Sequence, residues 1–295
     1  MKRAAMFIVM LALGTSVLAQ QQTGTPGGTQ SGSTPGGATQ GGTATPPAKH
    51  PLQAKTQPEF EAYKAANAIQ DPAARDKAAD EFAAKFPDSE LRVPLYKQAM
   101  RDYQSGNNAD KMQEMGRKVL AIDPDDPEAL VGVAEILTER TRDTDLDKDQ
   151  RLAEAAKLAQ HALDTIETDV NVPPGTPQEK VDAYKGFLRS SAYGILGTLA
   201  LNSDKYPQAE DYLRKAIAAL PQQPDPLAVL RLALALDKQG KYPDALKEAN
   251  HAVELTQDNT PSGRLARQEK DRLEKLTGGG NAKTSDTPQN PAPKQ

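Results

Sequence analysis

Apolar residues recur every three or four positions along the middle of the chain, a spacing that places them on one face of an α-helix. Two such stretches run from Ala192 to Leu201 and from Leu227 to Leu236. A second apolar-periodic stretch follows each of them after a short polar turn. Paired amphipathic helices joined by short turns pack as hairpins. The pattern therefore predicts an all-α fold.

Two of these hairpins repeat each other around the turn. Residues 205–209 read Lys-Tyr-Pro-Gln-Ala and residues 241–245 read Lys-Tyr-Pro-Asp-Ala, so matched positions lie 36 residues apart. A proline one residue after the tyrosine suits the first turn of a helix, where its missing N–H is not needed. Each unit is therefore predicted to be a helix, a tight turn and a second helix.

These units resemble the tetratricopeptide repeat (TPR) family, in which small residues allow two helices to cross closely. The fuller copy of the family's pattern is carried by Tyr193, Leu196, Gly197, Ala200, Ala209, Leu213, Ala216 and Pro221. The next copy has Gln257 in place of the closing proline, weaker copies start near Tyr96 and Leu130, and a first hairpin ends at Phe86. The resemblance implies an α-solenoid of stacked helix hairpins, a TPR-like superhelix, over residues 58–276.

Three segments depart from the plain repeat. Residues 141–146 are an insertion when the spacing is judged against the family's period. Residues 178–202 are predicted to form one helix longer than a normal first helix, whose extra turns should pack outside the repeat. Residues 263–276 have the pattern of an amphipathic closing helix, of the kind that arrays need at their ends.

The two ends of the chain differ from the middle. Residues 1–19 have a short basic start, a short apolar run and a small-residue exit, which are typical of a secretory signal peptide. The run is shorter than the ~20 residues that span a bilayer, although an uncleaved anchor is the alternative. The linker at residues 20–57, rich in Gly, Thr, Pro and Gln, and the tail at residues 277–295 have few large apolar side chains and are predicted to be disordered. We therefore expect a periplasmic or secreted protein with no membrane span after cleavage.

Composition narrows the range of partners. Without Lys2 and Arg3 the chain carries 34 basic and 40 acidic residues, which argues against nucleic acid as a ligand. The chain has no cysteine, so disulfides, thiolate metal sites and lipid attachment to a cysteine are excluded. With no tryptophan and five phenylalanines, the core must be built mainly from alanine and leucine.

The resemblance also implies where a protein or peptide ligand would bind. The concave face of a TPR array is lined by the first helix of each repeat, at fixed positions. Transferred to this chain, those positions give a candidate ligand groove at Lys97, Arg101, Glu135, Thr198, Leu201, Leu227, Leu230 and Leu234. The groove should change from basic through acidic to small and apolar. The set of Lys, Arg and Asn residues with which some family members grip a chaperone's C-terminal carboxylate is absent.

The apolar end of this groove needs a cover. The stretch Leu227–Leu236 is apolar nearly all round, and such a helix is normally buried all round. Leu227, Leu230 and Leu234 lie off its core face, and exposed apolar patches often mark interaction sites. Two covers are possible, a partner's apolar side chains or the chain's own closing or overlong helix.

Candidate chemistry is sparse. The carboxylates of residues 143–147 alternate as in a calcium loop, with Glu154 at the twelfth position, but Lys148 stands where such loops need glycine. Asp147 is better explained as a helix N-cap. His161 and His251 precede small alanines and fit partly exposed helix positions. With no phosphate loop, nucleophile elbow or zinc spacing, we predict no catalytic residue, cofactor or metal site.

The sequence therefore predicts a non-catalytic scaffold that binds a peptide or protein. Two alternatives stay open. One is a self-assembling structural spacer of the cell envelope, a homo-oligomer formed through the open ends of the array. The other is an accessory subunit of an envelope enzyme.

Overall fold

The computed structural model describes residues 52–173 and 175–278. The predicted signal peptide, residues 20–51 of the linker and the tail from residue 279 lie outside these residues. The described ranges contain eleven helices and no strand, which confirms the all-α prediction. In chain order the helices are α1 (Gln57–Asn67), α2 (Pro72–Lys85), α3 (Arg92–Ser105), α4 (Ala109–Ile122), α5 (Pro127–Arg140), α6 (Lys148–Asp169), α7 (Gln178–Asn202), α8 (Tyr206–Ala219), α9 (Pro226–Lys238), α10 (Tyr242–Glu254) and α11 (Pro261–Gly278). None of these helices is both long and apolar enough to cross a membrane.

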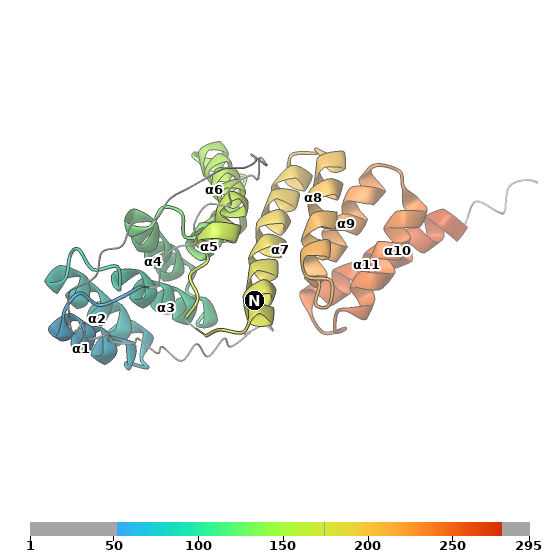
Figure 1. The fold of residues 1–295 in the computed structure, drawn as a ribbon. Coiled ribbons are helices and arrows are strands. Elements are labelled where there is room, and N and C mark those ends of the chain that lie inside the picture. The colour runs from blue at the N-terminus through green and yellow to red at the C-terminus, as the bar shows by residue number, and fades with distance from the viewer. Residues whose placement is uncertain (1–51, 174, 279–295) are drawn as a thin grey trace, which may run out of the picture. The chain divides into compact units, whose positions relative to one another are not determined.

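The helices pair as hairpins, in which α1, α3, α5, α7 and α9 are first helices and α2, α4, α6, α8 and α10 are second helices (Figure 1). The chain divides into two compact units. We call residues 52–126 with 165–181 the N-terminal unit, and residues 127–164 with 182–278 the C-terminal unit. Each unit is described separately below.

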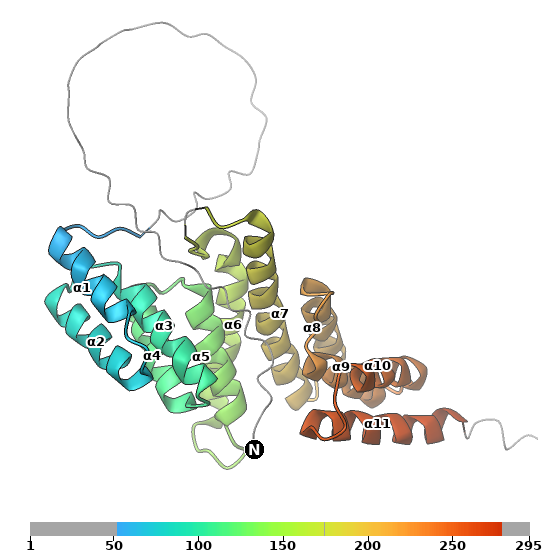
Figure 2. The ribbon, with the colours of Figure 1, turned by 90° about the horizontal axis from the view of Figure 1, so that it is seen from below.

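In the N-terminal unit, α1 to α4 pack in chain order (Figure 2). Thr56 begins α1 with a capping box, because its side chain accepts from the Glu59 N–H while Glu59 bonds back to the cap. The Asp71 side chain caps α2 by accepting a hydrogen bond from the Ala74 N–H at 2.8 Å. Tyr63 and Phe82 meet edge to face in the core, with ring centroids 6.4 Å apart.

In the C-terminal unit, α8 to α11 also pack in chain order (Figure 1). Their main core cluster consists of small and aliphatic side chains, with Leu213 and Leu236 fully buried beside six fully buried alanines, as the composition predicts. Those alanines are Ala209, Ala216, Ala233, Ala235, Ala245 and Ala249. Small side chains at these positions let neighbouring helices approach closely, which is how a chain with little aromatic content builds its core.

Three hairpin turns share one backbone conformation. The residue two positions before each second helix has a positive φ, with values of 54° at Asn107, 57° at Asp204 and 74° at Gly240. In each turn the next N–H bonds to a carbonyl five residues earlier, at 2.8 to 3.0 Å. This is the Schellman arrangement, which satisfies a carbonyl at the end of the first helix. The Lys-Tyr-Pro motif then starts α8 and α10, as the sequence predicts.

The departures from the repeat also lie where the sequence places them. The insertion falls in the loop between α5 and α6, and α7 runs over the whole of Gln178–Asn202. An early turn of α7 packs on the end of α8, because a Cβ on Gly186 would lie 2.8 Å from the Ala219 carbonyl oxygen. The closing helix α11 is two residues longer at each end than predicted and packs on α9 and α10. Its last two residues belong to the predicted tail.

Candidate functional site

One face of α7 carries the small residues of the predicted groove. Gly194, Thr198 and Leu201 lie four and three residues apart, so they share one side of the helix. The Thr198 hydroxyl donates to the Gly194 carbonyl oxygen at 2.7 Å and is thereby turned along its own helix. Leu201 is half-buried against the core cluster of α8, α9 and α10. On this side of α7, the helix surface at Gly194 is therefore not covered by the side chains of Thr198 and Leu201.

Gly194 differs from the other two glycines of α7. A Cβ on Gly197 would lie 2.6 Å from Leu213 Cγ, and one on Gly186 would meet backbone of α8. A Cβ on Gly194 would meet no described atom within 4 Å, apart from its own helix turn and chain neighbours. Glycine inside a helix costs about 1 kcal/mol relative to alanine. Packing within the described chain explains Gly186 and Gly197 but leaves Gly194 without a structural reason.

The leucines of α9 have two different environments. Leu230 is only 4% exposed and belongs to a cluster with Ala252 of α10 and Ala266 of α11. In the structure, Leu230 is therefore covered by the chain itself and not left open for a partner. The closing helix α11 contributes to this cover. Leu227 and Leu234 are half-buried. A charge at Leu230 would consequently disturb the core of the C-terminal unit, which makes that residue unsuitable for testing ligand binding.

Lys97 lies in the N-terminal unit and is buried. Its ammonium forms an ion pair with Asp126 at 2.7 Å, with side-chain exposures of 10% and 1%. Two oppositely charged groups this deeply buried mainly satisfy each other. Lys97, at the predicted basic end of the groove, is therefore engaged within the chain.

Of the other predicted groove residues, Arg101 and Glu135 are partly accessible and Thr198 is buried. Arg101, also in the N-terminal unit, is half-buried on α3, and Glu135 is half-buried on α5 of the C-terminal unit. Thr198 is 9% exposed. The C-terminal unit thus holds six of the eight predicted residues, on three first helices.

The carboxylates of the α5–α6 loop bind the chain's own cations. The Lys148 ammonium lies 2.7 Å from Asp143 Oδ1, and this neighbour lowers the pKa of the Asp143 carboxyl. Asp145 accepts from the Arg142 backbone N–H at 2.9 Å and pairs with Arg151 at 3.5 Å. Lys148, the residue that departs from the calcium-loop pattern, is the one that engages Asp143. Nowhere in the described ranges do three or more His, Asp or Glu residues gather as a metal site.

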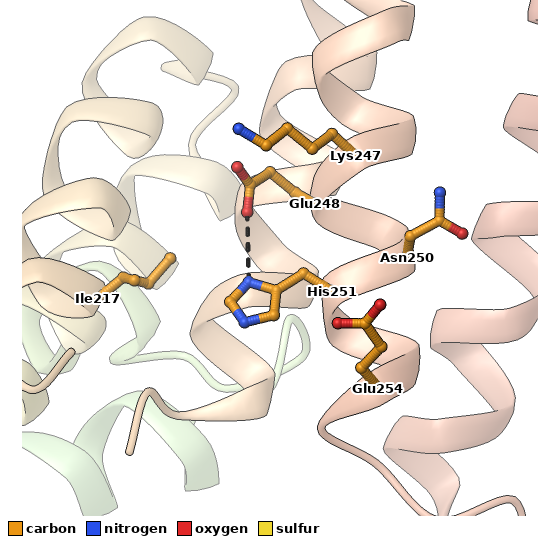
Figure 3. Close-up of a pocket in the computed structure, with 6 residues that line it drawn as sticks. All are labelled: Ile217, Lys247, Glu248, Asn250, His251 and Glu254. Carbon is orange, nitrogen blue, oxygen red and sulfur yellow. Dashed lines mark ion pairs between the residues drawn. The ribbon is translucent and has the colours of Figure 1, made fainter. Parts of the chain in front are cut away.

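The two helical histidines border two shallow hollows on second helices. His251 and Glu248 of α10 lie 3.8 Å apart and face Ile217 of α8 across one hollow (Figure 3). His161 of α6 borders the other hollow, which is walled by Leu196 and Tyr212. Both histidines are half-buried, as their positions before small alanines predict.

Glu210 is a polar centre of the C-terminal unit. Its carboxylate accepts from Lys241 Nζ at 2.7 Å and from Gln239 Nε2 at 2.9 Å, and Arg214 Nε donates to it at 3.0 Å. Burial alone would raise the pKa of Glu210, but these three donors outweigh it and lower the pKa. The carboxylate therefore ties α8 to the turn between α9 and α10.

The polar network of the N-terminal unit was not predicted. Asp76 of α2 accepts from the Tyr103 hydroxyl and the Lys111 ammonium, both at 3.1 Å. Asp80, one turn later, accepts from Lys118 at 2.8 Å and from the Tyr96 hydroxyl at 2.9 Å. Burial of Tyr96 and its bond to Asp80 raise the pKa of that hydroxyl to about 12. The four-residue spacing of the two aspartates on α2 is the only sequence signal for this network.

Comparisons with known proteins give structural neighbours only. No family model matches the chain, and no curated protein matches it. The chain is similar to PilW, a widely conserved type IV pilus biogenesis factor, at 22% identity and a TM-score of 0.46, covering 78% of this chain and 96% of that one. It is similar to YrrB, a TPR protein with an unusual peptide-binding site, at 16% identity and a TM-score of 0.45, covering 69% and 87%. A thermophilic TPR protein of Thermus thermophilus matches at 15% identity and a TM-score of 0.41, covering 73% and 98%.

Proposed function

We propose that this chain is a non-catalytic protein-interaction scaffold that works in the periplasm or outside the cell. The described part of the chain consists of helix hairpins, and many of its charged side chains form ion pairs with one another. A binding role needs an accessible surface with some apolar character and a place for close approach. The first-helix face of the C-terminal unit offers both.

The observation that carries the proposal is the open space at Gly194. A glycine in the middle of a 25-residue helix lowers helix stability. At Gly194, no atom of another described segment packs into the space that a Cβ would occupy. A partner that approaches the α7 backbone closely at Gly194 would account for it. The half-buried Leu201 of α7 and Leu227 and Leu234 of α9 would supply apolar contacts. The ligand is therefore a peptide or protein segment with apolar side chains.

Capture from cell-envelope extract tests this proposal. The full chain is compared with Gly194→Leu, which fills the open space, and with Ala218→Leu, which adds the same side chain at an exposed position of α8. We expect one partner to be retained by the full chain and by Ala218→Leu and lost by Gly194→Leu, while thermal melting shows all three proteins folded. Retention of the same partner by Gly194→Leu would contradict binding at this face.

The proposed location rests on the sequence of residues 1–19, and a separate measurement tests it. The mass of the protein recovered from cells should correspond to a chain that begins at Gln20, and the protein should be released with the envelope fraction. A chain that keeps Met1 and stays in the cytoplasm would overturn the proposed export without affecting the binding proposal.

A further inference from the structure

A stripe of four polar residues runs along the exposed side of α10. Its members are Lys247, Asn250, His251 and Glu254, which lie within two helix turns and on one side of the helix (Figure 3). Lys247 and Glu254 are exposed, and Asn250 and His251 are half-buried. The stripe therefore begins with a positive charge and ends with a negative charge about 10 Å further along the axis.

An equivalent stripe occurs on α6, 90 residues earlier. Lysine, amide, histidine and acid recur there in the same order, as Lys157, Gln160, His161 and Asp164. The α6 stripe borders a hollow whose other walls are Leu196 of α7 and Tyr212 of α8. The following hairpin thus partly covers it. On α10, Ile217 of the preceding α8 is the one hollow-lining residue from another helix. Only the closing helix α11 follows α10 in the described part of the chain, and it contributes no residue to this hollow.

The two end charges of the α10 stripe have no ion pair in the described chain. Neighbouring charges do, since Lys241 pairs with Glu210, Arg272 with Asp237, and Lys270 with Glu274. Lys247 and Glu254 are exposed charges of opposite sign, seven residues apart on one helix. That arrangement is complementary to itself when a second identical helix lies antiparallel against it.

We propose that α10 is a two-fold interface between two copies of this chain. In an antiparallel pair centred between residues 250 and 251, Lys247 of each copy faces Glu254 of the other. A two-fold axis makes both contacts at once, because the same patch is used by both partners. Asn250 of each copy then faces His251 of the other, and an amide can both donate and accept a hydrogen bond. Side chains of the second copy then enter the hollow between α8 and α10 of the first, beside Ile217.

The interface is small and largely polar. One helix pair buries much less than the roughly 800 Å² per partner of a standard stable interface. The dimer should therefore form at micromolar or higher concentrations and should weaken as salt is added, because exposed ion pairs are screened.

Charge reversal tests the pairing. The full chain is examined by analytical ultracentrifugation over a range of concentrations, beside Lys247→Glu, Glu254→Lys and the double variant that carries both changes. Lys64→Glu, at an exposed position of α1, is the control for a change in net charge. We expect the full chain, the control and the double variant to dimerise, and each single variant to dimerise at least about tenfold more weakly, because both pairs become repulsive.

The decisive sample is an equal mixture of the two single variants. In the mixed pair, the two introduced charges are opposite in sign and face each other, while the other contact keeps the original Lys247 and Glu254. A heterodimer should therefore form where neither variant alone dimerises. Circular dichroism should show that every variant is folded. A full chain that stays monomeric at all concentrations, single variants that dimerise normally, or a mixture that stays monomeric would each overturn the proposal.

Discussion

Both units consist of helix hairpins, but the residues buried inside them differ in type. Five charged side chains are buried in the N-terminal unit, whereas Glu269 is the one buried charged residue in the described part of the C-terminal unit. The five are Glu59, Arg75, Asp76, Lys97 and Asp126. Second helices of the C-terminal unit bury alanines at matched positions instead. One architecture can thus be held together by long-range polar bonds or by close apolar contact.

This difference predicts how each unit responds to change. In the N-terminal unit, Asp76 and Asp80 bind groups 16 to 38 residues away along the chain, so loss of one of these groups should weaken a bond between distant segments. In the C-terminal unit, the crossing of helices depends on volume, so a single methyl group should matter more than a charge. Four substitutions test this contrast.

The largest effect is expected at the buried ion pair of the N-terminal unit. Lys97→Met removes the ammonium 2.7 Å from Asp126, whose side chain is 1% exposed, and so breaks a buried ion pair. We predict a loss of about 3–5 kcal/mol in the free energy of unfolding, measured with urea. Lys64→Met, at an exposed position of α1, should change the free energy of unfolding by less than about 0.5 kcal/mol. A loss at Lys97 no larger than that of the control would contradict the description of this unit.

The matching effect in the C-terminal unit should come from one methyl group. Gly197→Ala places a Cβ 2.6 Å from Leu213 Cγ, in a cluster with no free volume to accept it. We expect a destabilisation of about 1–3 kcal/mol by overpacking, despite the higher helix propensity of alanine. When Gly197→Ala is combined with Leu213→Ala, the total loss should be smaller than the sum of the two single losses, because the shorter side chain makes room for the added Cβ, and thermal melting of the three variants measures this. Stability equal to that of the unmodified chain would mean that α7 and α8 do not cross closely here.

A smaller effect is expected in the turn before α10. Gly240 has a φ of 74°, where a side chain is unfavourable, so Gly240→Ala should cost about 1 kcal/mol. The equivalent Asn107 has a φ of 54°, and Asn107→Gly should be neutral or slightly stabilising. Denaturant midpoints of the two variants should therefore move apart, and equal shifts in the same direction would be inconsistent with a shared turn conformation.

The smallest effect concerns the pH dependence at Glu210. Its donors lower the pKa of the carboxyl in the folded state, so its contribution to stability is complete above the unfolded pKa of about 4.3. That contribution is lost as the pH falls through the lower folded-state value. Glu210→Gln should therefore lose on the order of 1 kcal/mol or less at pH 7 and nothing at pH 2 to 3. A difference that persists at pH 2 would assign the effect to packing instead.

The sequence predicted the helices well and the side-chain environments less well. Helix periodicity and the Lys-Tyr-Pro turns are local signals, which is why α7, α8 and α10 begin where expected. The burial of Lys97 depends on an aspartate 29 residues away, and that of Leu230 on how α11 packs against α9 and α10. Neither partner can be identified from spacing within one helix. Gly194 shows the same limit, because its open surroundings are visible only in three dimensions.

The measurement that tests the central claim most directly is a titration of the captured partner against Gly194→Leu with stability measured in parallel. A leucine at an open helix position should raise the free energy of unfolding by about 0.5–1 kcal/mol. If the partner approaches α7 at Gly194, affinity should fall at least tenfold, about 1.4 kcal/mol, so stability and binding move in opposite directions. Unchanged affinity in the stabilised variant would show that the partner binds elsewhere, and that Gly194 does not serve ligand binding.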